Sequence, residues 1–307
     1  AFLDNLSCNK LPQKDGRIGL TLFHGHNGGI MAEQSISRIS ENEFLLMGAI
    51  GSQLKDYNWM DWHRGDFDVQ IEDITEEWGG LLLTGPKARE ILEQVSMDDL
   101  SSAAFPWLSC KDIQIDSAQI FAMRVSYAGE LGWELHMPSY QVISIYESLM
   151  EFGKPLGLRN FGTRAFNSMR MEKGYRAYGH EFTEEISGIE AGMDRFIDLS
   201  RDFIGAQNMR QRHANGVDMA LAYLVFDDEV PAEVFGNEAV YVNGEHTGII
   251  TGGAYGYRVG KSLGFAYVKP EHAVAGQAMT VETSDGTRQC HVEIDPAYDP
   301  SSALLRS

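Results

Sequence analysis

The 307-residue sequence has few basic residues and no long hydrophobic run, and each shortage excludes a class of protein. Lysine and arginine number 25 against 44 acidic residues, which gives a formal net charge of −19. Contact with nucleic-acid phosphates needs a basic face, so this balance argues against a nucleic-acid-binding protein. No apolar run is long enough to span a bilayer, which argues against a membrane protein.

Cysteine is also scarce. The three cysteines form no CxxC pair, and an odd, scattered set is typical of reduced thiols rather than of a disulfide framework. We therefore expect a reducing compartment, either the cytoplasm or, in a eukaryote, the mitochondrial matrix. Several motifs are missing as well: the sequence has no GxGxxG, no GxxxxGK[ST] and no GxSxG, so nothing predicts binding of FAD or NAD, a phosphate-binding loop or a serine nucleophile. His24 and His26 have no HxxE or CxxC nearby to complete a ligand set, and we predict no metal site.

The remaining composition is that of a globular protein, with 43% hydrophobic and 22% charged residues. Alternating patterns predict strands, and helical spacing predicts helices that start or stop at proline and glycine. The predicted strands come in hairpin-like clusters rather than in strict β–α alternation, so we expect an α+β fold. The predicted strands are 19–23, 35–38, 44–48, 80–84 and 120–126, and the predicted helices are 86–92, 140–152 and 163–173.

Strand and turn signals dominate after about residue 215. Asn243-Gly244 and Asp285-Gly286 are both strong signals for two-residue hairpins. We therefore predict two domains, an α+β region over residues 1–215 and a small antiparallel barrel over residues 216–307.

Residues 124–135 form the segment richest in candidate functional side chains. We predict a strand that reaches Tyr127, a turn at Gly129 and a second strand through Glu134, which would bring Tyr127 and Glu134 close together. A carboxylate accepts two parallel N–H donors in one plane, which suits a planar ligand. The alternative is a solvated hairpin with an exposed glutamate and a packed tyrosine, and this segment alone favours that alternative.

Two further segments carry candidate residues. The loop after the third predicted helix contains Tyr175 and Arg176 and follows Arg170, a set that suits an anionic aromatic ligand. The alternative is an ordinary helix end whose basic residues balance the helix dipole. Near the N-terminus, an Asn-Gly-Gly turn places Glu33 beside a predicted cleft, although a lone glutamate after a turn is usually a surface residue.

Taken in order, these segments resemble the folate-binding aminomethyltransferase family, whose founding member is the glycine-cleavage T-protein. The similarity is closest to the C-terminal folate domain of dimethylglycine oxidase, dimethylglycine dehydrogenase and sarcosine dehydrogenase. It rests on Gly28-Gly29-Ile30, RVSYAGELGWE (124–134), RMEKGYRAYG (170–179), TGGAYGYRVGKSLGFAYV (251–268) and the ending DPAYDP (295–300). MEKGYRAYG and the DPxYDP ending favour the amine-oxidising branch.

The resemblance implies a T-protein-like cloverleaf around a central folate pocket, with a C-terminal antiparallel β-barrel. It also implies that Tyr127 and Glu134 hold the pterin, while residues lining the pocket or contacting the anionic tail include Arg170, Tyr175 and Tyr255. Glu33 stands where the family has an aspartate that acts on the reacting folate nitrogen, so the carboxylate is kept but is one methylene longer.

The implied function is capture by tetrahydrofolate of a one-carbon unit, an imine or formaldehyde, released by oxidative N-demethylation of a methylated amine. The product would be 5,10-methylenetetrahydrofolate. Two alternatives stay open: direct methyl transfer to tetrahydrofolate by a demethylase of the same fold, and a non-catalytic folate-fold binding or assembly module.

The resemblance also bears on what this sequence leaves out. Relatives carry strands, and in the oxidising members a flavin domain, before the helix in which Ala1 lies. We therefore expect an N-terminally incomplete folate region, with FAD only on a missing domain or a partner subunit. Because the expected ligand is an anion and the chain is strongly acidic, binding requires local positive charge, for which the candidates are Arg170, Arg176, Arg258 and Lys261.

Overall fold

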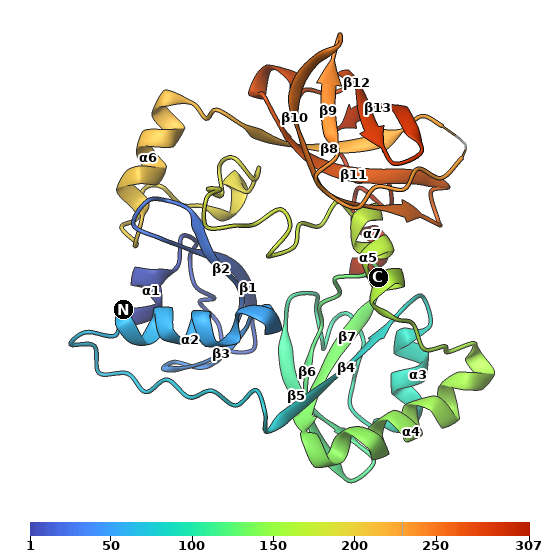
Figure 1. Ribbon diagram of the computed structural model, residues 1–307. Helices are drawn as coiled ribbons and strands as arrows, with labels where there is room; N and C mark the ends of the chain where they lie inside the picture. Colours follow the sequence, from blue (N-terminus) through green and yellow to red (C-terminus); the bar gives the residue numbers. More distant parts are fainter. Residues whose placement is uncertain (229) are drawn as a thin grey trace.

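The computed structural model describes residues 1–228 and 230–307, and its elements form three lobes around a common centre (Figure 1). The first lobe contains a three-stranded antiparallel sheet in the order β1-β2-β3. Its elements are α1 (Phe2–Leu6), β1 (Ile18–His24), β2 (Ile30–Ser40), β3 (Glu43–Met47) and α2 (Gln53–Trp62). Alternate residues of β2, such as Ala32 and Ile36, are buried in a hydrophobic cluster that includes Trp59 of α2.

The second lobe is a four-stranded antiparallel sheet with two helices on one face. The strand order is β4-β7-β6-β5, and Trp133 and Leu135 of β7 are buried against the helices. Its elements are β4 (Trp78–Thr84), α3 (Ala88–Val95), β5 (Cys110–Ile115), β6 (Ala118–Met123), β7 (Gly132–Pro138) and α4 (Val142–Gly153). The opposite face of the sheet is turned toward the centre of the molecule (Figure 1).

The third lobe is a closed six-stranded barrel in the order β10-β11-β8-β13-β12-β9, as the sequence predicts. Its strands are β8 (Ala220–Phe226), β9 (Ala239–Val242), β10 (Glu245–Gly256), β11 (Lys261–Val268), β12 (Ala278–Thr283) and β13 (Gly286–Glu293). Both predicted hairpins form, and Asn243 and Gly244 have the positive φ values that a tight hairpin turn requires.

Three helices lie between or beside the lobes: α5 (Thr163–Glu172), α6 (Ala206–Asn215) and α7 (Ala303–Arg306). α5 runs from the second lobe to the barrel, and α7 lies next to it (Figure 1). Short 3-10 turns complete the list: η1 (Ile50–Ser52), η2 (Ser139–Gln141), η3 (Lys154–Leu156), η4 (Asp194–Phe196) and η5 (Pro270–His272). The domain division near residue 215 stays a prediction; α6 ends at Asn215 and β8 begins at Ala220.

One predicted strand is shorter than expected. The alternation over 120–126 continues past the strand itself, but β6 ends at Met123. The backbone of Arg124 instead bonds to Ser109 and Leu108, which lie before β5. Tyr127 therefore lies in a loop, residues 124–131, which we call the Tyr127 loop.

Candidate functional site

The Gly-Gly turn before β2 is explained by a segment that crosses directly over it. Gly28 has a φ of +85°, and a Cβ on Gly29 would lie 1.8 Å from the backbone oxygen of Glu184. The amide of Ile30 donates to the carbonyl of Ile186 at 2.8 Å. No residue larger than glycine fits at position 29 without moving this backbone, so the turn fixes where β2 begins relative to the segment 184–186.

Glu33 lies on β2, on the face of the sheet turned away from α2. The pKa of its carboxyl is raised to about 7, mainly by burial and also by the charge of Glu181, while the charge of Arg176 opposes the rise. A carboxyl group with a pKa near 7 exchanges a proton readily at neutral pH, which is what a general base requires. Glu33 therefore has the properties expected of the predicted catalytic carboxylate, although its role stays a prediction.

Tyr127 is part of an aromatic wall. Its ring stacks on Tyr175, with centroids 5.5 Å apart and an interplanar angle of 24°, and packs on Phe166 at 5.4 Å. Its hydroxyl donates to the backbone carbonyl of Arg176. Tyr127, predicted to hold the pterin, and Tyr175, predicted to line the pocket or contact the anionic tail, thus lie together and present flat rings of the kind on which a planar ligand stacks.

Glu134 is on β7 and faces away from the helices. Its neighbours Trp133 and Leu135 point into the core, so Glu134 lies on the face of the sheet turned to the centre of the molecule. Its side chain is 32% exposed and lies 3.4 Å from His136 Nε2. The backbone of Glu134 pairs with Leu82 and Met123, not with the Tyr127 loop. Glu134 Oε2 is the oxygen beside His136, while no side chain among the described residues lies within hydrogen-bond distance of Oε1, so the carboxylate can accept from a ligand on that face.

Arg170 makes a buried ion pair instead of facing open space. It donates to Glu181 Oε2 at 2.7 Å and to the carbonyl of Tyr175 at 2.9 Å, and both charged side chains are at most 3% exposed. Glu181 also accepts from the Ala177 amide and from Thr251 of β10, each at 2.9 Å. This pair orders the loop that carries Tyr175; a direct contact between Arg170 and the ligand stays a prediction.

Arg176 is a candidate to meet an anionic ligand. It donates to the backbone oxygens of Gly174 and Ala191, and in the described part of the chain no carboxylate lies within 4.0 Å of it. Burial lowers its pKa, as does the nearby Arg195. By contrast, Arg258 pairs with Glu130 at 3.1 Å, and Lys261 donates to a backbone carbonyl.

Tyr255 lies apart from the aromatic wall. Its ring packs edge-on against Tyr257 at 5.1 Å, and its hydroxyl is beside Gly260 in the turn after β10. Its backbone carbonyl accepts from Ser168 of α5 at 2.6 Å. The described contacts do not bring it to Tyr127 or Tyr175, and its role in the pocket stays a prediction.

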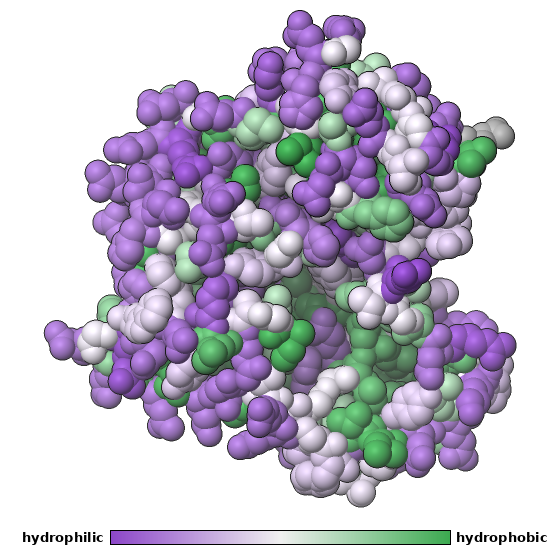
Figure 2. Space-filling view, viewed as in Figure 1, coloured by the Kyte–Doolittle hydropathy of each residue, from purple (hydrophilic) through white to green (hydrophobic). Residues whose placement is uncertain are grey.

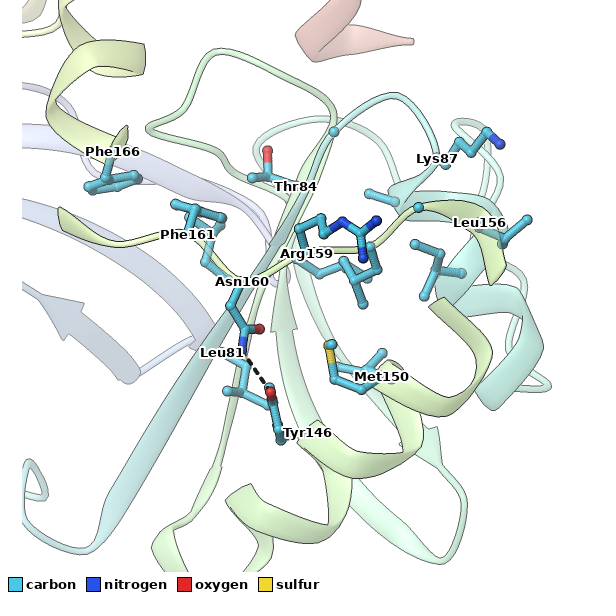
Figure 3. A pocket seen from close by; sticks show the side chains of 18 of the residues that line it. Leu81, Thr84, Lys87, Tyr146, Met150, Leu156, Arg159, Asn160, Phe161 and Phe166 are labelled. Carbon is cyan, nitrogen blue, oxygen red and sulfur yellow. Dashed lines mark hydrogen bonds between the residues drawn. The ribbon is translucent and has the colours of Figure 1, made fainter. Parts of the chain in front are cut away.

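The molecule is hollowed near the middle of the face shown in Figure 2, where the lobes meet. A separate recess of about 700 Å³ lies between β4, α3, α4 and residues 156–163 (Figure 3). Its walls are mainly hydrocarbon, and Asn160 donates to Tyr146 across it at 2.8 Å. Phe166 lines one end and also contacts Tyr127, so the recess adjoins the aromatic wall without containing a predicted site residue.

Within residues 1–228 and 230–307, no three or more histidine, cysteine, aspartate or glutamate side chains lie together in a way that could hold a metal ion. His24 is buried, and burial lowers its pKa to about 3, so it is neutral. In the same residues no helix has the length and apolar character needed to cross a membrane.

Sequence reasoning missed Glu181 and Phe166 as parts of the site. Glu181 follows the RMEKGYRAYG motif by two residues, and this position was the only available signal. Its importance comes from Thr251 and Arg170, which are distant in sequence.

The structure has three lobes around a centre; it brings Glu33 near the stacked Tyr127 and Tyr175, and the sheet of the second lobe turns Glu134 toward that centre. Residues 1–201 match the GCVT N-terminal domain, and residues 220–299 match the glycine cleavage T-protein C-terminal barrel domain. The chain belongs to the glycine cleavage T-protein (aminomethyltransferase) family, which confirms the resemblance and the predicted enzyme class.

Individual proteins of known name are also similar to this chain in sequence. The chain is 38% identical to human mitochondrial dimethylglycine dehydrogenase over 286 residues, which is 92% of this chain and 33% of that protein. It is 30% identical to an aminomethyltransferase of Thermoanaerobacter sp. (strain X514), covering 91% of this chain and 76% of the relative. The chain thus spans about a third of the length of the dehydrogenases it matches.

A solved structure confirms the predicted fold. The aminomethyltransferase T of the glycine cleavage system from Bartonella henselae superposes with a TM-score of 0.85 at 20% identity, covering 97% of this chain and 81% of that one.

Proposed function

We propose that this chain binds tetrahydrofolate and uses it to capture a one-carbon unit, an imine or formaldehyde, from oxidative N-demethylation of a methylated amine. The product is 5,10-methylenetetrahydrofolate. The observation that carries the proposal is Glu33, a carboxyl group whose pKa lies near 7, in electrostatic contact with the stacked Tyr127. The names of the dehydrogenase relatives support the choice of a methylated amine.

The residues present fit the proposed ligand. The pterin ring is planar and carries adjacent N–H donors, which match the two coplanar acceptor oxygens of the Glu134 carboxylate. Tyr127 and Tyr175 offer a stacking surface, and Arg176 offers a positive charge without a carboxylate partner among the described residues. Tetrahydrofolate supplies the nucleophilic nitrogens to which the one-carbon unit becomes attached.

Glu33 supplies the proton transfer in this account. Its ionised carboxylate accepts the proton that the attacking nitrogen loses, and its carboxyl form can return that proton to the leaving oxygen or amine. With formaldehyde, two carbon–nitrogen bonds form and one water leaves. Glu134 and the aromatic wall hold the nucleophile in place. The translational and rotational entropy is therefore lost on binding, and less of it remains to be lost in the reaction step.

Generation of the one-carbon unit belongs to another polypeptide segment in this proposal. The sequence contains no GxGxxG dinucleotide-binding motif. We propose that the amine is oxidised on a flavoprotein domain or subunit associated with this one.

Product analysis tests the proposal. The chain is given tetrahydrofolate and formaldehyde, and formation of 5,10-methylenetetrahydrofolate is followed above the uncatalysed rate. We expect Glu33→Gln to keep ligand binding and to lower this rate by about a hundredfold, the usual contribution of a general base. An unchanged rate would remove Glu33 from the mechanism, and 5-methyl product from a methylated donor would indicate direct methyl transfer.

A further inference from the structure

The DPAYDP motif (295–300) packs beneath the Tyr127 loop, and two of its side chains make buried polar contacts there. After β13, residues 295–307 leave the barrel and run to the junction of α5 with the second lobe, where α7 forms (Figure 1). We call this part of the chain the latch segment. It contains Tyr298 and Asp299, which support two consecutive residues of the Tyr127 loop.

Tyr298 supports Glu130. Its hydroxyl donates to Glu130 Oε1 at 2.7 Å, and Glu130 is 5% exposed. Arg258 of the barrel lies 4.6 Å above the Tyr298 ring and pairs with the same carboxylate at 3.1 Å. The amide of Tyr298 donates to the carbonyl of Glu172 at 3.0 Å. The hydroxyl of Tyr298 holds Glu130 directly, its ring packs against the Arg258 that pairs with Glu130, and its backbone is anchored to the end of α5 at Glu172.

Asp299 supports the adjacent residue, Gly129. It pairs with Lys173 at 3.1 Å, with side chains 7% and 1% exposed. The stem of Lys173 lies directly under Gly129, where a Cβ would be 2.9 Å from Lys173 Cγ and Cδ. Farther along, Leu305 is buried, and Arg124 donates to the carbonyl of Arg306 at 3.1 Å. The latch segment therefore reaches both the start and the end of the Tyr127 loop.

We propose that the latch segment fixes the Tyr127 loop in the shape that binds the ligand, with Tyr298 a positioning residue that acts through Glu130. This inference rests on the proposed tetrahydrofolate binding. Tyr298 does not itself reach the ligand, because its hydroxyl bonds to Glu130 and its ring is covered by Arg258. Tyr298 connects the barrel and the end of α5 to a loop of the second lobe. The relative position of the two lobes and the conformation of the loop are therefore linked.

Calorimetric titration with tetrahydrofolate tests the inference. Tyr298→Phe removes one hydroxyl that donates to a charged acceptor, and we expect Kd to rise about three- to tenfold with little change in Tm. The control is Tyr241→Phe, which removes a tyrosine hydroxyl from an exposed carboxylate, Glu282, at 3.1 Å on the barrel. The control should leave Kd unchanged.

A double variant distinguishes an effect of Tyr298 on the position of Tyr127 from a general loss of structure. In a chain that already carries Tyr127→Ala, Tyr298→Phe should change Kd less than about twofold, because the residue being positioned is gone. Glu130→Gln weakens the contacts of Glu130 with both Tyr298 and Arg258, so it should raise Kd at least as much as Tyr298→Phe does, and it serves as the second test of the same contact.

The outcomes are distinct. If the unsubstituted chain does not bind tetrahydrofolate, the proposed function fails. If it binds and Tyr298→Phe binds equally well, or the same loss persists without Tyr127, the latch is overturned and the proposed function stands.

Discussion

Glu33 is the residue on which the chemistry depends, and its environment distinguishes it from an ordinary surface glutamate. The family resemblance predicted that the carboxylate of Glu33 acts on the reacting folate nitrogen. The structure adds the neighbours Glu181 and Arg176, which set its proton affinity. These neighbours come from a segment about 150 residues away, so no local pattern around position 33 could have indicated them.

The raised pKa of Glu33 predicts a pH-dependent stability. The folded carboxyl ionises near pH 7 and an ordinary one near 4.5, so between these values the folded state holds a proton that the unfolded state has released. The stability contributed by this group therefore falls as pH rises through that window and stays low above it. The free energy of unfolding should drop by up to about 3 kcal/mol.

Urea unfolding near pH 5 and near pH 8 measures this drop. Glu33→Gln should abolish the part that Glu33 contributes and should be more stable than the natural chain near pH 8. Parallel pH dependences in the two proteins would contradict the assigned pKa.

At the scale of elements, the Tyr127 loop shows what alternation of residue types can and cannot reveal. The pattern through Ser126 looks like a strand, yet β6 stops at Met123 because the backbone of Arg124 bonds to residues before β5. The same side-chain pattern fits both structures. The two barrel hairpins, in contrast, were predictable from local signals, since Asn243 and Gly244 have positive φ in the first turn and Gly286 has positive φ directly after the second.

The support of this loop by Lys173 leads to a prediction for Gly129. Gly129 has a φ of +73°, and a Cβ there would meet the buried stem of Lys173. Gly276 is the matched control, with a φ of +75° and no atom within 4 Å of its Cβ position. Gly276→Ala should therefore show only the cost of the backbone conformation, about 1 kcal/mol.

Gly129→Ala should lose at least about 1 kcal/mol more than Gly276→Ala, because Lys173 is held by Asp299 and cannot easily move. Denaturant unfolding of both variants gives the difference. Equal losses would show that the Lys173 stem is not packed against the loop.

At the scale of the whole molecule, Glu181 joins parts that the sequence keeps far apart. Its carboxylate accepts from Arg170 of α5 and Thr251 of the barrel, and its backbone carbonyl accepts from Tyr267 at 2.7 Å. The cloverleaf arrangement was predicted through the family resemblance, and the barrel was predicted from its strand and turn signals as well. The manner in which the lobes are joined was not predictable, because it depends on pairs of residues that only the folded chain brings together.

This network predicts a large effect for a conservative change. Glu181→Gln leaves the buried Arg170 without its counter-charge, and we expect a loss of about 3 kcal/mol in unfolding free energy. Asp202→Asn is the control, because Asp202 is 95% exposed in its pair with Arg210 and should lose less than about 1 kcal/mol. Similar small losses in both would contradict a joining role for Glu181.

The most direct test of the account is the affinity of the purified chain for tetrahydrofolate, measured by calorimetry with and without Glu134. Glu134→Ala removes the planar acceptor, and we predict that Kd rises at least about tenfold, the loss expected for charge-assisted hydrogen bonds. Glu147→Ala, at an exposed position on α4, should leave Kd unchanged. Equal affinity of Glu134→Ala and the natural chain, or no binding by either, would contradict the assignment of this centre as a folate site.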